Sequence, residues 1–86
     1  MNAKIKRYVK ERDEMLKKCD IGAFVQFVRD HADDLPDGFV GRIEAASDEL
    51  KLCVMHKMIV NAVKLPKELR DKSALWLVSR GYTLQI

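Results

Sequence analysis

Apolar side chains recur every three or four residues along most of this chain, which is the period of an α-helix. The first such segment runs from about Ala3 to Lys18, and Lys and Glu residues fill its opposite side. Its apolar positions, with the residue just after it, are Ile5, Tyr8, Val9, Met15, Leu16 and Cys19. One stripe of this kind predicts a helix that packs a single face against the rest of the protein.

A second helix is predicted directly after Asp20, because its carboxylate can accept a hydrogen bond from a free backbone N–H at a helix start. Phe27 lies at the flank of the apolar stripe that follows. The stripe itself consists of Ile21, Phe24, Val25, Val28 and Ala32. The segment Leu35-Pro36-Asp37-Gly38 then has the composition of a type I turn and ends this helix.

The next apolar stretch begins at Phe39 and is interrupted at Ser47, where a serine and two acidic residues are typical of a helix N-terminus. We therefore predict a short helix from Phe39 to Ala46 and a fourth helix from about Asp48 to Lys64. The alternative is one continuous helix over residues 39–64, which would be more than twice the mean length of about 12 residues.

The segment 48–64 is apolar around most of its circumference, and its polar residues Lys57, Asn61 and Lys64 share a narrow strip. A helix of this kind belongs in the centre of a bundle. A fifth helix is predicted to begin at Pro66 and to stop at Gly81, since proline suits a first helical position and glycine a C-terminal stop. The residues after Gly81 are expected to form a short extended tail that docks on the bundle.

These segments predict an all-α fold: a small single-domain bundle of four or five helices with a nearly all-apolar central helix. The 86 residues suit one domain over residues 1–86 with one core. The longest apolar run, Ala74–Val78, is far too short for a membrane span. No apolar stretch follows the first basic residues, so we expect no signal peptide and a cytoplasmic protein with no membrane partner.

The net charge of +3 conceals a segmented pattern. Residues 1–19 carry a balance of +4, residues 20–49 of −6 and residues 50–86 of +5. Two explanations stay open. The basic ends can pair with the acidic middle within the fold, or the two signs can form a surface that recognises a partner of complementary charge.

The sequence gives little support for metal binding or for catalysis. Cys53 and His56 lie three residues apart, and Cys19 and His31 lie elsewhere, without the close pairs of ligands that zinc sites have. No third group is evident that would orient a cysteine–histidine pair for nucleophilic catalysis. We therefore predict no metal, no cofactor and no enzymatic activity, and we expect both cysteines to be buried, reduced thiols.

Two other motifs are absent from the sequence. The acidic cluster Asp30, Asp33, Asp34 and Asp37 lacks the loop spacing of a calcium-binding EF-hand. No glycine-rich phosphate-binding motif occurs anywhere in the chain. A solvated acidic turn is the expected role of the four aspartates.

Two functions are favoured for such a chain, and an enzyme ranks third because it would require a deep pocket around Cys53 and His56. The first is a non-enzymatic protein–protein interaction or regulatory module, capable of self-association, because a small bundle often has more apolar surface than it can cover. Its candidate contact residues are the large aromatics Phe24, Phe27, Phe39 and Trp76. The alternative is a small nucleic-acid-binding protein that uses basic residues of both end segments. Its candidate contact residues are Lys4, Lys6, Arg7, Lys10, Lys64, Lys67, Arg70 and Lys72.

Overall fold

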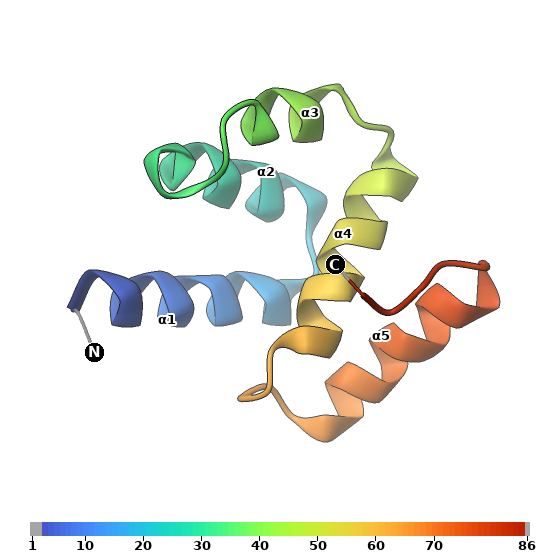
Figure 1. Cartoon of the computed structure of the whole chain (residues 1–86). Helices are drawn as coiled ribbons and strands as arrows, with labels where there is room; N and C mark the ends of the chain where they lie inside the picture. Colours follow the sequence, from blue (N-terminus) through green and yellow to red (C-terminus); the bar gives the residue numbers. More distant parts are fainter. Residues whose placement is uncertain (1–2, 86) are drawn as a thin grey trace.

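The computed structural model describes residues 3–85 and is all-helical over that range, as predicted (Figure 1). No β-strand occurs in this part of the chain. The elements in chain order are α1 (Ala3–Lys18), α2 (Ile21–Asp30), the single 3-10 turn η1 (Ala32–Asp34), α3 (Phe39–Ala45), α4 (Asp48–Asn61) and α5 (Lys67–Ser79).

Two side-chain caps fix the helix starts that the sequence predicts. The Asp20 carboxylate accepts a hydrogen bond of 3.0 Å from the backbone N–H of Ala23, the third residue of α2. The Ser47 hydroxyl accepts one of 3.2 Å from the backbone N–H of Leu50 in α4. Each cap satisfies a donor that the helix itself leaves unpaired. The helix is therefore interrupted before Ser47, and the continuous helix over residues 39–64 is not formed.

The helices are arranged around α4. In Figure 1, α2 runs back along α1, α3 lies over α2, and α4 crosses near the ends of α1 and α2. On the far side of α4, α5 returns beside it. Because α4 contacts α1, α2 and α5, the most apolar helix has the central place that its composition predicts.

The core lies where α1, α2 and α4 meet. Leu16 of α1, Phe24 of α2, and Met55 and Ile59 of α4 are all fully buried. Ile43 adds the contribution of the short α3. Burying a side chain of this size stabilises the fold by about 1.5–3 kcal/mol. The core therefore ties four helices together.

The predicted end of α4 is wrong by about one turn, because the helix stops at Asn61 rather than near Lys64. Pro66 disfavours helical geometry at the residue before it, Leu65. The chain instead turns over residues 62–66 and buries Ala62 and Leu65 in the core. The same turn leaves the Val63 side chain 78% exposed.

The end of α5 follows the predicted glycine stop. Gly81 adopts φ +78°, a conformation that favours glycine. The Gly81 N–H donates to the Val78 carbonyl and the Tyr82 N–H to the Leu77 carbonyl, both at 3.0 Å, which is a Schellman motif. The tail then passes α4, where the Asn61 side-chain amide donates to the Leu84 carbonyl at 3.1 Å. Over residues 82–85 the tail forms no helix or strand and bends at Leu84, and the Asn61 hydrogen bond docks it on α4.

None of the helices in residues 3–85 combines the length and the apolar composition that crossing a bilayer requires.

Candidate functional site

The structure separates the four candidate aromatic contact residues into two pairs. Phe24 and Phe27 are buried in the core, so they do not present surface to a partner. Phe39 and Trp76 are only partly buried. The difference arises because Phe24 and Phe27 lie on the face of α2 that packs against α1 and α4, while Phe39 begins the short α3 at the edge of the core.

Phe39 lines a groove between α1 and α4. The groove consists of two adjoining depressions of about 230 and 210 Å³ that share Arg12 and Asn61. We call it the α1–α4 groove. The apolar end is lined by Tyr8, Arg12, Phe39, Val54, Met58 and Asn61. The basic end is lined by Lys6, Val9, Arg12, Asn61, Val63 and Lys64.

Much of this groove is the outer layer of the core. Tyr8, Phe39, Val54 and Met58 are partly buried and pack against the buried cluster with their inner sides. Their outer sides form the apolar wall of the groove. Desolvation by burial raises the pKa of Tyr8, with a smaller opposing effect from the Arg12 guanidinium. The wall is therefore held in place by the packing beneath it.

The charged groups along the groove are all basic. Lys6 comes from α1 and Lys64 from the turn after α4, so residues from the two basic segments meet at one end. The guanidinium of Arg12 is engaged by Asp13, with Nε and a terminal nitrogen 3.2 and 3.1 Å from the same carboxylate oxygen. No acidic side chain is among the described residues that line the groove.

The remaining candidate nucleic-acid contacts are scattered or engaged elsewhere. Lys4 lies 3.1 Å from Asp34, and Lys67 lies 3.4 Å from Asp71. Arg70 donates to the Leu65 carbonyl at 3.1 Å and is partly buried. Arg7 and Lys10 are exposed on α1, and Lys72 lines a separate pocket beside α5. Of the eight basic residues, the structure brings Lys6 and Lys64 together in one depression.

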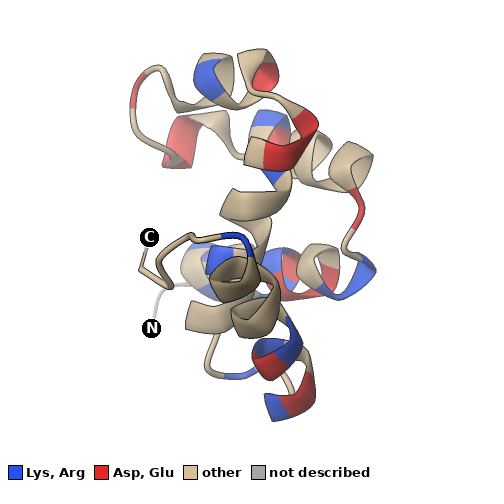
Figure 2. Cartoon of the chain, turned by 90° about the vertical axis from the view of Figure 1, so that its right-hand side faces the viewer, with Lys and Arg blue, Asp and Glu red and all other residues tan. Residues whose placement is uncertain are grey.

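Pairing within the fold explains part of the segmented charge. Lys4 pairs with Asp34, and Arg80 lies 3.7 Å from Glu49, so each basic end makes a contact with the acidic middle. Lys6 and Lys64 instead meet in the groove. Figure 2 shows charges of both signs on the first turns of α5 and uncharged residues on its later turns.

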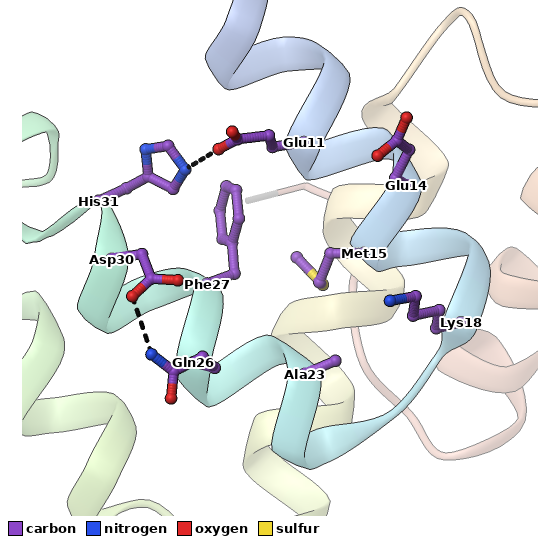
Figure 3. Close-up of a pocket in the computed structure, with 9 residues that line it drawn as sticks. All are labelled: Glu11, Glu14, Met15, Lys18, Ala23, Gln26, Phe27, Asp30 and His31. Atoms are coloured by element: carbon purple, nitrogen blue, oxygen red, sulfur yellow. Dashed lines mark hydrogen bonds and ion pairs between the residues drawn. The ribbon is translucent and has the colours of Figure 1, made fainter.

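A second depression, on the other side of α1, lies against α2 (Figure 3). Its floor is formed by Met15 and Phe27. His31 Nε2 lies 2.6 Å from a carboxylate oxygen of Glu11, and its ring packs against Phe27 with centroids 4.5 Å apart. The Gln26 amide donates to Asp30 at 2.8 Å. The contact between Glu11 and His31 joins α1 to the end of α2, whereas Gln26 and Asp30 pair within α2. The polar contacts of this depression therefore have a structural explanation.

A third pocket, of about 300 Å³, brings one cysteine and one histidine together. Cys19 and His56 both line it, together with Ser73 and Trp76. His56 Nδ1 is hydrogen-bonded to the Ser73 hydroxyl at 2.9 Å, and its ring stacks on Trp76 at 4.4 Å. Burial lowers the pKa of His56, and the nearby Arg80 cation lowers it further.

The expectation that both cysteines are buried is wrong for Cys19. Cys53 is buried, but Cys19 is exposed with φ +49° in the tight turn that joins α1 to α2. The stripe of α1 predicts burial only while the helix continues, and the helix ends at Lys18. Among residues 3–85, no group of three or more His, Cys, Asp or Glu side chains could hold a metal ion.

The sequence does not single out Val9, Val54, Met58 and Val63 as surface residues. Each lies at an apolar position of a predicted helix, where burial is the usual outcome. One feature of the sequence could have indicated that Val63 is exposed. Pro66 disfavours helix at Leu65 and so shortens α4. The groove itself depends on how α1 crosses α4, which no local pattern encodes.

Comparisons of the chain with models of protein families, with curated proteins and with solved structures found no match.

Proposed function

We propose that this protein is a non-enzymatic protein-interaction module whose α1–α4 groove binds a helix of another protein that carries apolar and acidic side chains. The single observation that supports this proposal is the composition of the groove. An apolar wall that includes Phe39 and Met58 adjoins an end where Lys6 and Lys64 meet with no acidic residue beside them in the lining.

The apolar wall favours an amphipathic segment. Recognition of a helix in a groove uses apolar anchors spaced three or four residues apart. Aromatic and methionine side chains at such sites give contact area, and methionine adapts to different anchors. Phe39, Tyr8 and Met58 supply these side chains here, over a wall that the core supports.

The basic end selects for acidic groups in the partner. Exposed lysines gain little from a single ion pair, about 0–1 kcal/mol. Their main effect is on orientation and on the exclusion of partners with the wrong charge. Lys6 and Lys64 therefore define which end of an incoming helix carries its carboxylates.

A fluorescein-labelled helical peptide of about 15–20 residues provides the test, since shorter helices are marginal in water. It carries two Leu residues three positions apart and two Glu residues one to two turns before them, in an Ala and Gln background. Fluorescence anisotropy is expected to show saturable binding. The double variant Lys6→Glu with Lys64→Glu should weaken binding at least about tenfold, or about 1.4 kcal/mol.

Two matched controls make the result specific. Lys10→Glu with Lys17→Glu makes the same charge change on exposed positions of α1 that do not line the groove, and it should leave affinity within about twofold. A peptide with Lys in place of Glu should bind the double variant better than the unaltered protein. Absence of peptide binding, together with salt-sensitive binding of a single-stranded DNA oligonucleotide, would replace this proposal with the nucleic-acid alternative.

A further inference from the structure

The outer face of α5 carries exposed apolar and acidic side chains, which is the combination that the groove is proposed to bind. Leu75 and Val78 lie three residues apart on this face and are 70% and 60% exposed. Glu68 and Asp71 lie on the same face, one to two turns before them, and both are exposed. The spacing of these four residues places them within one stripe of a helix.

The order of groups along α5 matches the order along the groove. The groove has its lysines at one end, beside the highly exposed Val63, and its aromatic and methionine residues at the other. On α5 the two carboxylates precede the two apolar side chains. A helix laid along the groove can therefore set carboxylates against lysines and apolar side chains against the apolar wall.

We infer that the α1–α4 groove of one copy binds the outer face of α5 of a second copy. This inference rests on the proposed function of the groove and names one partner for it. The two surfaces are different patches of the same chain, so the contact is heterologous. Each pair of copies leaves one groove and one α5 face open, so association proceeds head to tail into short chains.

The contact is weak for two reasons. Lys67 and Lys72 flank the α5 face, and Lys67 pairs with Asp71 at 3.4 Å. Both side chains of that pair are largely exposed, so exchanging one partner costs little. The face is also narrow, which places the contact among interfaces of less than about 1,200 Å². Association is therefore expected at concentrations near 1 mM rather than at about 1 μM.

Sedimentation velocity on three proteins tests the inference. The unaltered chain is expected to rise in weight-average mass with concentration beyond a dimer. A groove variant, Val63→Glu with Lys64→Glu, and a helix variant, Leu75→Lys with Val78→Lys, should each remain monomeric. All four positions are exposed, so both variants should keep the fold, and circular dichroism checks this.

Mixing the two variants gives the decisive result. The helix variant retains an intact groove and the groove variant an intact α5 face, so an equimolar mixture should form a heterodimer and nothing larger. Leu50→Lys changes an equally apolar residue that is 51% exposed outside both surfaces, and it should associate like the unaltered chain.

Three outcomes would overturn the inference. A mixture that stays monomeric removes the heterologous contact. Dimers that persist in the groove variant but not in the helix variant point to symmetric pairing of α5 instead. An unaltered chain that is monomeric near 1 mM rejects self-association, and binding of the acidic peptide would then show that the proposed function of the groove still stands.

Discussion

The side of α1 that faces α2 and the side that faces α4 differ in how their polar and apolar side chains are arranged. Towards α2, His31 pairs with Glu11 of α1, and Phe27 fills the space between the helices. Towards α4, the depression is lined by apolar side chains and by lysines that meet no carboxylate in its lining. The α2 side thus has a charged contact between the helices, and the lining of the α4 side has none.

This difference separates residues that hold the fold from residues that are available to a partner. A polar network whose members satisfy each other fixes one arrangement of the helices. An apolar surface left open above a core costs stability unless something covers it, and such surfaces mark interaction sites. Substitutions of the packed and paired residues on the α2 side should therefore act on stability, and substitutions on the α4 side should act on binding.

The largest effect is expected on the α2 side. Phe27→Ala should lower the free energy of unfolding by about 3–5 kcal/mol, because it empties a buried site. Phe39→Ala on the α4 side removes a partly buried ring, and its cost should be roughly half as large. Urea unfolding measures both. Equal costs would contradict the division between the two sides.

The next largest effect concerns the contact between Glu11 and His31. Glu11→Gln weakens the contact with His31, whose side chain is only 11% exposed, and should cost about 1 kcal/mol of stability. Lys64→Gln in the groove makes a comparable change in charge and should change stability by less than about 0.5 kcal/mol. Thermal unfolding of the two variants provides the measurement, and a larger loss for Lys64→Gln would reverse the assignment.

Tyr8 connects the two sides and supplies a pH test. Its ring packs against Phe27 and His31, and it also lines the groove. Burial raises the pKa of Tyr8 above the ordinary value of 10.0. The neutral phenol is therefore favoured in the folded protein, and its contribution to stability is present below pH 10 and is lost as the pH rises through the raised pKa.

The measurement uses a Tyr82→Phe background, because the pKa of Tyr82 is also raised, chiefly by burial. The ultraviolet absorbance of ionised tyrosine should then report Tyr8 alone. Tyr8→Phe should remove the alkaline loss of stability that this residue causes. Binding of the acidic peptide should raise the pKa of Tyr8 further, and an unchanged titration would place the peptide away from the groove.

The smallest effect is expected at Asp34, which lies beside His31. The hydrogen bond from Lys4 lowers the pKa of Asp34 below the ordinary value of 3.8, and His31 adds a smaller contribution. Asp34 therefore contributes stability above its ordinary pKa and loses it as the pH falls through the lowered value. Lys4→Gln should raise the pKa of Asp34 towards 3.8 in a carboxyl-carbon NMR titration. Peptide binding in the groove should not change.

Local features of the sequence predicted most of the fold. Asp20, Ser47 and Gly81 act through their immediate neighbours, so their roles as caps and stop could be inferred without the structure. The central place of α4 also followed from its composition. The end of α4 did not follow from its apolar pattern, because Pro66 disfavours helix at Leu65 and the turn over residues 62–66 buries that residue instead.

Only parts of the candidate site could be predicted from the sequence. Phe24 and Phe39 are the same residue type on apolar stripes, and only the crossing of the helices makes one buried and the other part of a groove. Lys6 and Lys64 were both candidates, but their meeting depends on contacts between distant segments. Cys19 was misplaced because burial of a residue after a helix end depends on the turn that follows.

The most direct test of the groove is a map of where the acidic helical peptide binds. In a titration followed by two-dimensional ¹H–¹⁵N NMR, the largest shifts are predicted at Lys6, Phe39, Met58 and Val63, with the residues around His31 and Gln26 almost unmoved. Shifts concentrated between α1 and α2, or no saturable shifts at all, would contradict the account.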